Sequence, residues 1–414
     1  MRISLSSPVR KTAFLGGGTL VLLAYLTFCT QAFIAYWITR TATVVGFTRA
    51  AKIDPLDSYY PEAIGLYYLD EEQSKASQFL EQALRLDRHS ARLWLEVATS
   101  YRLTQQPDKQ RAAVMNALEN APKDIPVEWE AANLFLVAGD NLTGFRLMSD
   151  VAAVDPSRRD VAVFTVLRHS GGDAALTLGN LPATTEVRQS LFRLLLRDQK
   201  LSAADQVWPA LMATSGEVDR PMVFTYFDSL LARHEVARAT AVWQSFARRD
   251  SEMRKHVAND GLVANGDFET PLLNAGLEWR RHPVDGITLA QQRSIFHGGN
   301  TALQLDLNTN RVEDGGLFQL VPVEPNSHYQ LSAFLRAEEV ACANGLRLSV
   351  SDYYTGTNLM ISDELLGSFP WRQSTGEFTT GPETQLIKLS FARTPDVGVI
   401  RGSLWLDDVH LEKK

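Results

Sequence analysis

The sequence predicts a multidomain protein of α and β parts, with an N-terminal transmembrane helix, a solenoid of stacked helix pairs and a C-terminal antiparallel β-sandwich. Three observations predict this fold class. Residues 13–38 carry no charge, helical landmarks recur at a nearly constant period between positions 50 and 156, and short alternating strands follow one another after residue 257. The expected divisions are therefore 1–12, 13–38, 39–256 and 257–414.

Composition and charge narrow the classes of function. Of the 414 residues, 45% are hydrophobic and 21% are charged, which is ordinary for globular domains. The net charge is −7, and residues 260–414 hold 12 basic and 20 acidic residues, so the acidity lies in the last third. No segment is strongly basic, which predicts that the chain does not bind nucleic acid. The two cysteines, Cys29 and Cys342, lie in different regions, and no disulfide is expected between them.

Residues 13–38 predict a membrane-spanning signal anchor. The 26 uncharged residues of this range exceed the roughly 20 needed to cross a bilayer core. Arg2, Arg10 and Lys11 precede the run, and Tyr36 and Trp37 close it, which predicts a cytoplasmic segment 1–12 with the bulk of the chain outside. Arg40, Arg49 and Lys52 on the far side oppose this orientation. A buried core helix and a cleaved signal peptide are the alternatives.

Residues 50–156 predict three helix pairs. Four similar strings recur at nearly equal spacing, the first before the pairs and one at the end of each pair: AAKIDP (50–55), QALRLDR (82–88), NALENAP (116–122) and DVAAVDP (150–156). Within each period, large residues such as Tyr60 and Trp94 mark a first helix, and small or apolar residues such as Ala83 and Gly144 mark a second. Residues 191–211 and 223–246 are again two-helix units, and 157–190 is a degenerate one.

This pattern resembles the tetratricopeptide repeat, a helix–turn–helix unit of about 34 residues. The resemblance departs from the family at Gln110, Ile64 and Ala132, where the repeat prefers small residues or glycine. It implies a concave surface that binds protein partners. The alternative is an irregular all-α domain whose spacing is accidental.

The C-terminal region from residue 257 predicts a sandwich of short strands. Alternating segments occur at 301–307, 317–323, 328–337, 345–354, 371–380, 384–393 and 402–412, separated by turn signals such as Pro325-Asn326 and Gly381-Pro382. The motifs NGDFE (265–269), HGGNTALQL (297–305) and LWLDDVHLE (404–412) resemble carbohydrate-binding modules of the galactose-binding-like jelly-roll type. A resemblance of fold does not fix the ligand.

Two sites follow from this resemblance. One is a structural calcium ion where the first strand meets the last, held by Asp267 and Glu269 with Asp407 or Asp408 and by carbonyls near Gly299-Asn300. The other is a glycan on an exposed sheet face, contacted by Phe334, Arg336, Arg347 and Tyr353, which alternation turns away from the core. The alternatives are solvated strand-end acids and a sheet face that is covered by other parts of the chain.

No motif predicts an enzyme. In HEVAR (234–238), Arg238 occupies the position where a zinc-protease helix needs its second histidine, and neither G-x-S-x-G nor a P-loop is present. The interpretation is a scaffold in a bacterial inner membrane, with its bulk in the periplasm. Its array would recruit proteins and its sandwich would touch glycan, in cell-envelope polysaccharide assembly or export. The alternatives are a structural interaction subunit that binds no sugar and a glycan-active enzyme.

Overall fold

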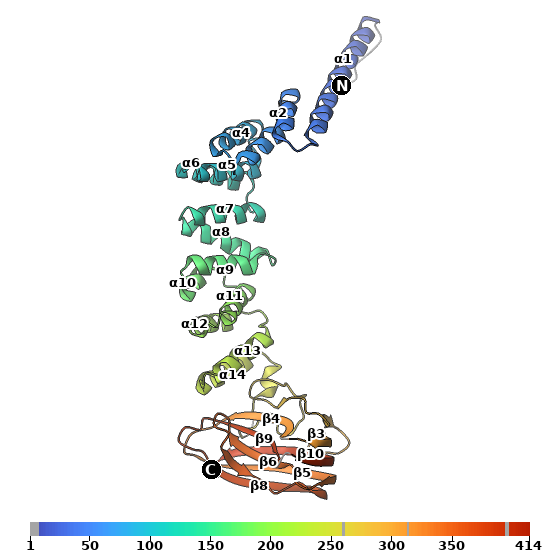
Figure 1. Ribbon diagram of the computed structural model, residues 1–414, viewed down its shortest axis with the longest axis vertical. Coiled ribbons are helices and arrows are strands. Elements are labelled where there is room, and N and C mark those ends of the chain that lie inside the picture. The colour runs from blue at the N-terminus through green and yellow to red at the C-terminus, as the bar shows by residue number, and fades with distance from the viewer. Residues whose placement is uncertain (1–7, 259–260, 313, 394–396) are drawn as a thin grey trace. The chain divides into compact units, whose positions relative to one another are not determined.

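The computed structural model describes residues 8–258, 261–312, 314–393 and 397–414. The chain divides into two compact units, Met1–Gly216 and Glu217–Lys414. The first unit is helical, and the second joins a helix pair to a β-sandwich (Figure 1). The predicted fold class, helices followed by two antiparallel sheets, is confirmed.

The first unit begins with the long apolar helix α1 (Pro8–Thr39), which is followed by α2 (Val44–Ile53). Its segment Lys11–Thr39 is long and apolar enough to cross a membrane. Side chains such as Leu20 and Val21 are 70% and 72% exposed, whereas Ala35 near its end is fully buried against α2 and α3. The first seven residues of the expected cytoplasmic segment 1–12, including Arg2, lie outside the described residues.

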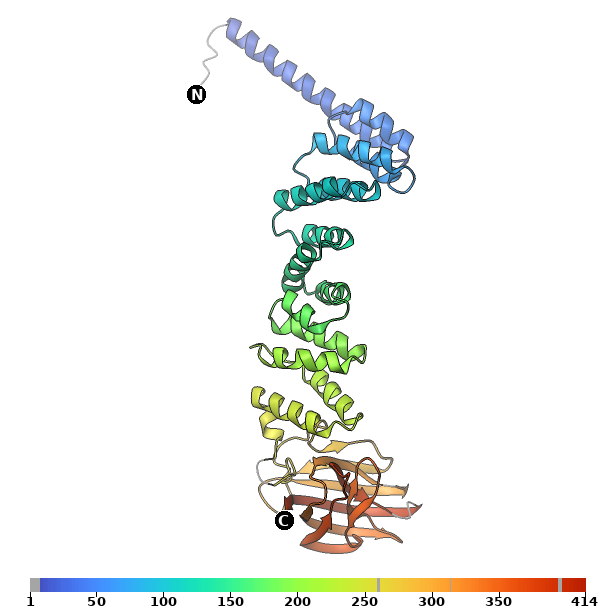
Figure 2. The same cartoon turned by 90° about the vertical axis from the view of Figure 1, so that its left-hand side faces the viewer.

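Three helix pairs follow at the predicted period (Figures 1 and 2). They are α3 (Tyr59–Tyr68) with α4 (Gln73–Leu86), α5 (Ala91–Leu103) with α6 (Pro107–Asn120), and α7 (Ile125–Val137) with α8 (Asn141–Val154). The second helices of the pairs end at Leu86, Asn120 and Val154, and α2 ends at Ile53, as the sequence landmarks predict.

Capping side chains explain where several of these helices begin. The side chains of Thr43, Ser90, Asp124 and Asp140 each accept a hydrogen bond from the backbone N–H three residues further on. Such caps satisfy an N–H group that has no partner within the helix. The local sequence therefore favours the start of each of these helices at its capping residue.

The predicted contrast between large and small residues is largely confirmed. Ala76, Leu80 and Ala83 are fully buried on α4, and Tyr60 is 3% exposed on α3. Tyr67 differs, because its side chain is 52% exposed.

Gln110 departs from the repeat pattern yet is accommodated in the array. It is 5% exposed, and its side-chain amide donates a hydrogen bond to the Leu134 carbonyl at 3.2 Å. A buried polar side chain thereby replaces the small residue of the repeat without leaving its donor unpaired.

The helices after α8 include those of the degenerate helix pair expected at 157–190. The first unit ends with α9 (Arg159–His169), the short α10 (Ala174–Asn180), α11 (Thr185–Arg197) and α12 (Leu201–Met212). The second begins with α13 (Arg220–Leu231), α14 (Val236–Arg249) and the 3₁₀ turn η1 (Met253–His256). The boundary expected at residue 257 stays a prediction, and α13 and α14 belong to the compact unit that contains the sandwich.

The sandwich consists of two five-stranded antiparallel sheets. The first sheet has the order β1-β4-β9-β6-β7, and the second has the order β2-β3-β10-β5-β8. Their strands are β1 (Arg280–Arg281), β2 (Ile287–Gln292), β3 (Ala302–Arg311), β4 (Asp314–Pro322), β5 (His328–Cys342), β6 (Arg347–Asp352), β7 (Asn358–Ile361), β8 (Gly367–Thr379), β9 (Leu386–Ala392) and β10 (Val397–Lys413).

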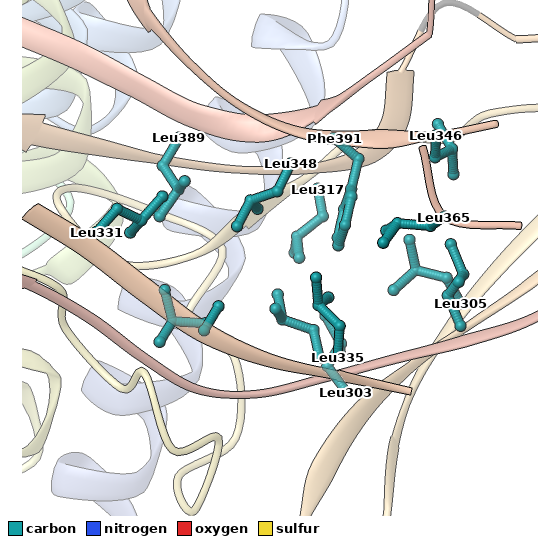
Figure 3. Close-up of a cluster of buried hydrophobic side chains, with 14 of the residues drawn as sticks. Leu303, Leu305, Leu317, Leu331, Leu335, Leu346, Leu348, Leu365, Leu389 and Phe391 are labelled. Atoms are coloured by element: carbon teal, nitrogen blue, oxygen red, sulfur yellow. The ribbon is translucent and has the colours of Figure 1, made fainter. Parts of the chain in front are cut away.

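The core lies between the two sheets (Figure 3). Leucines of the second sheet, such as Leu303 and Leu335, point toward Leu348, Leu389 and Phe391 of the first. The inward positions predicted for β5, namely Tyr329, Leu331, Ala333 and Leu335, are 1% exposed or less. Alternate residues of β5 therefore point to the outer face of the second sheet.

Candidate functional site

The outer face of the first sheet is partly covered by the helix pair α13–α14. Leu320 and Leu386 lie on this face at β4 and β9, yet they are 1% and 0% exposed, and α14 contacts β4. The Tyr354 hydroxyl donates a hydrogen bond to the Leu231 carbonyl at 2.9 Å, and the His234 ring stacks on Tyr354 with centroids 3.8 Å apart. This sheet therefore carries α13 and α14 against it.

An ion pair adds to this contact. The Arg280 guanidinium, on β1, lies 2.8 Å from the Asp228 carboxylate of α13 and 5.8 Å from the centre of the Phe227 ring. Gly276 approaches the Trp243 ring so closely that a Cβ atom at this position would overlap it. The helix pair and the sandwich thus share one packed surface.

The outer face of the second sheet has a different character, since aromatic and cationic side chains gather on it. Leu404 and Leu406 of β10 point into the core, so Trp405 points outward. Trp405 pairs with Gln304 of β3 on one side and with Arg336 of β5 on the other. The Arg336 guanidinium lies over the indole, 5.4 Å from its centroid.

Two polar atoms at this point lack partners. Among the described residues, Nε1 of Trp405 and Nε of Arg336 are both buried without an acceptor. Trp405 is only 3% exposed, whereas the Arg336 side chain is 33% exposed and lies 3.6 Å from Glu338. An unsatisfied buried donor costs about 1–3 kcal/mol.

A second aromatic group adjoins this pair. The His297 ring stacks on Phe334 with centroids 3.5 Å apart, and it meets Trp371 of β8 edge to face at 5.8 Å. The His297 Nδ1 atom lies 2.6 Å from the Asp408 carboxylate. Phe334 thus lies beneath His297 rather than offering a bare ring, and Trp371 lies beside them, half-buried.

The four residues expected to contact glycan do not form one surface. Phe334 and Arg336 lie together on the second sheet, but Arg347 lies on β6 in the first sheet, and Tyr353 follows that strand. Arg347 pairs with Glu364 at 2.6 Å, and the Tyr353 side chain is 42% exposed. Strands β5 and β6 are adjacent in the sequence, but the chain crosses from one sheet to the other between them.

The acidic residues expected to bind calcium lie near one another at the strand ends. Asp407 is fully buried and accepts hydrogen bonds from the N–H groups of His297 and Gly298. Burial raises the pKa of Asp407 to about 6. The Glu269 carboxylate accepts from the N–H groups of Asn300 and Thr301, and the first of these bonds is the main cause that lowers its pKa.

These contacts do not form a ready metal site. Glu269 and Asp407 already accept hydrogen bonds from backbone N–H groups, and the described residues hold no group of three His, Cys, Asp or Glu side chains that could bind a metal. Asp267, Glu269 and Asp408 instead line a polar hollow of about 520 Å³. The calcium ion stays a prediction, and thermal unfolding with and without a chelator tests it.

The helical array carries a separate charged cluster. The Arg92 guanidinium of α5 bridges Glu62 of α3 and Glu96 of its own helix. Burial, with the nearby charge of Glu62, raises the pKa of Glu96 to about 7. This cluster joins two successive helix pairs, and nothing about it assigns a partner.

Sequence reasoning missed three members of the outer face of the second sheet, namely His297, Trp371 and Trp405. Alternation in LWLDDV (404–409) already turned Trp405 away from the core, so this residue could have been found. His297 lies in a loop, and its position over Phe334 depends on a contact between segments that are distant in the sequence.

No known protein family matches the sequence, and no curated protein sequence does so either. Solved structures do resemble the chain. MamA, a tetratricopeptide-repeat protein, is 13% identical over 37% of this chain and 89% of its own, with a TM-score of 0.31. A carbohydrate-binding module of family 4 is 15% identical over 37% of this chain and 99% of its own, with a TM-score of 0.28.

A third structure is the module TmCBM61 in complex with β-1,4-galactotriose. It is 21% identical over 38% of this chain and 100% of its own, with a TM-score of 0.28. The solved structures thus include both resemblances expected from the sequence. At these identities and TM-scores, the fold assignment rests on the chain's own structure.

Proposed function

We propose that this chain is a membrane-anchored binding protein whose β-sandwich binds glycan on the outer face of its second sheet, while its helical array binds protein partners. The unpartnered donors of Trp405 and Arg336, beside the rings of Trp371 and His297, carry the glycan part of the proposal. Carbohydrate hydroxyl groups supply acceptors for such donors, and aromatic side chains supply apolar contact.

The proposal includes location and role. The apolar segment Lys11–Thr39 supports a single-pass anchor. Basic residues before it favour a cytoplasmic N-terminus, in the inner membrane of a bacterium, with the array and sandwich in the periplasm. We extend the role to the assembly or export of cell-envelope polysaccharide. The only support for this extension is that a helical array and a β-sandwich occur in one chain. In this role the chain acts by binding and not as an enzyme.

Binding of the full-length protein to a panel of polysaccharides tests the glycan part. Arg336→Ala and Trp371→Ala are expected to weaken the affinity at least about tenfold, because each removes a contact worth roughly 1.5 kcal/mol or more. Both side chains are partly exposed, so the fold should survive, and thermal unfolding checks this.

Arg347→Ala and Tyr353→Ala provide the matched control. These residues belong to the other sheet and should leave the affinity unchanged. Binding that is lost in these variants and kept in the first two would contradict the chosen face. Failure to bind any polysaccharide would leave the purely structural interaction subunit as the better description.

The array part is tested by photo-crosslinking in cells. Leu142 and Val137 lie at the α7–α8 turn and are 80% and 66% exposed, and exposed apolar side chains often mark contact surfaces. A crosslinker at either position is expected to give a discrete protein adduct. If neither position yields one, this surface of the array does not bind a protein.

A further inference from the structure

The joint between α1 and α2 holds a hollow of about 460 Å³ that the proposed function does not use. It is lined by a tryptophan, two arginines and small polar groups, among them Trp37, Arg40, Thr41, Thr43, Gly46 and Arg49. In the described part of the chain, neither Arg40 nor Arg49 has an ion-pair partner. The hollow therefore combines two uncompensated positive charges with one large aromatic ring.

The length of α1 indicates where this hollow would lie relative to a lipid bilayer. At 1.5 Å per residue, the 29 residues Lys11–Thr39 span about 43 Å, whereas a bilayer core is about 30 Å thick. The excess of about 13 Å corresponds to roughly nine residues. The part of α1 that packs on α2, around Ala35 and Thr39, accounts for much of this excess.

The α1–α2 joint is also fixed in place. Ala35 of α1 and Ala50 of α2 are both fully buried in one small cluster with Tyr60 of α3. A Cβ atom at Gly46 would lie 3.2 Å from the Ile38 carbonyl oxygen, so the two helices approach closely here. If α1 spans the bilayer, this packing holds the hollow at the level of the lipid headgroups.

We propose that this hollow binds the headgroup of an anionic phospholipid, an inference that rests on the membrane anchorage proposed above. The phosphodiester lies between the guanidinium groups of Arg40 and Arg49, which match phosphate in charge and in hydrogen-bonding geometry. The Trp37 ring lies at the interface between acyl chains and headgroups, where tryptophan is enriched. The hollow has the size of a small-molecule site.

The test uses the full-length protein in nanodiscs of phosphatidylglycerol, phosphatidylcholine or a mixture of the two. Lipid that remains bound after transfer to mild detergent is identified by native mass spectrometry. We expect retention of phosphatidylglycerol in preference to phosphatidylcholine. Arg40→Gln and Arg49→Gln should each lower that preference about fivefold, and the double variant about 30-fold.

Lys52→Gln is the matched control, because Lys52 is an exposed cation on the same helix as Arg49 and outside the hollow. It removes the same charge as Arg49→Gln and should change the preference less than twofold. An equal loss in both variants would show general attraction to an anionic surface and would overturn the site. Release of the lipid by excess inorganic phosphate would overturn it too, since the hollow would then recognise phosphate alone.

The two proposals fail in different ways. Equal retention of both lipids by a membrane-embedded protein overturns the headgroup site and leaves the anchorage intact. Recovery of the full-length chain, with residues 13–38 present, in the soluble fraction overturns the anchorage and the headgroup site together.

Discussion

Glu278 shows how one buried carboxyl group is built into the sandwich. It is fully buried between β-sandwich loops, where its side chain accepts hydrogen bonds from the Asn265 amide at 3.0 Å and the Leu273 N–H at 2.5 Å. Burial nevertheless raises the pKa of Glu278 to about 7, because an ionised carboxylate loses its hydration there. The folded state therefore binds the proton of this group more tightly than the unfolded state.

This raised pKa predicts a pH-dependent stability. The protonated Glu278 carboxyl group makes its full favourable contribution to the free energy of unfolding below the pKa of the unfolded state, about 4.5. This contribution is lost as the pH rises through about 7, the pKa in the folded state. The free energy of unfolding is expected to fall by up to about 3 kcal/mol over this pH range. Glu278→Gln should flatten this part of the pH profile when thermal unfolding is followed between pH 4.5 and 8.

The exposed Glu383 is the control for this experiment. Glu383→Gln removes an exposed carboxyl group and should change the free energy of unfolding by less than about 0.5 kcal/mol. The same slope in Glu278→Gln as in the parent protein would show that Glu278 does not titrate in this range. Burial also raises the pKa values of Asp407 and Glu96, so these two groups should leave a residual slope of the unfolding free energy with pH in the variant.

At the scale of single elements, the helix pair α3–α4 depends on one close approach. A Cβ atom at Gly65 of α3 would lie 2.6 Å from Cγ of Leu80 on α4. Leu80 is fully buried and has little room to shift. The absence of a side chain at Gly65 therefore sets the distance between these two helices.

Gly65→Ala is expected to destabilise the protein by about 1–3 kcal/mol, because overpacking outweighs the gain in helix propensity. Gly179, on α10, has no atom within 4 Å of an added Cβ. Gly179→Ala should accordingly be neutral or slightly stabilising. Chemical denaturation of both variants compares the two positions, and equal effects would show that close packing at Gly65 is unimportant.

The elements differ in how far the sequence predicts them. The helix ends near residues 53, 86, 120 and 154 were predictable, since similar residue strings recur there at a nearly constant spacing. The strands β1, β2 and β7 were not predicted, because they are short or carry few apolar residues and depend on their neighbours for hydrogen bonds. Local signals specify a helix more completely than they specify an edge strand.

The candidate site shows the same limit. Alternation correctly turned Phe334, Arg336 and Arg347 away from the core. It could not show that Arg347 belongs to the other sheet, because strand order is set by pairing between distant segments. It also could not bring Trp405 beside Arg336, since these residues lie far apart in the sequence and meet only through the pairing of β5 with β10.

At the scale of the whole molecule, the sandwich and the helix pair α13–α14 form one compact unit. Leu320 and Leu386 are buried on the outer face of the first sheet, and Tyr354 is bonded to Leu231. Removal of the pair would expose this apolar surface and break the ion pair of Arg280 with Asp228. A domain boundary at residue 257 matches the change from helical to strand patterns in the sequence. It would nevertheless separate α13 and α14 from the sheet on which they pack.

A comparison of two fragments tests this division. Residues 217–414 are expected to unfold cooperatively and at a higher temperature than residues 257–414. At about 25 cal/mol per Å² of apolar surface, even about 100 Å² of newly exposed area costs roughly 2.5 kcal/mol. Identical melting temperatures for the two fragments would show that α13 and α14 contribute nothing to the stability of the sandwich.

The short connection at residues 40–43 has a consequence for how the protein meets its partners. α1 and α2 share buried alanines across a tight turn, so within the described residues no flexible linker separates α1, the anchor in our proposal, from the first helix pair. A domain on a flexible linker explores a volume set by the length of that linker. The first helix pair, packed directly on a membrane-spanning α1, would instead keep a constant tilt and height above the lipid surface. A partner confined to the same membrane would then encounter it by lateral diffusion in two dimensions, always from the same side.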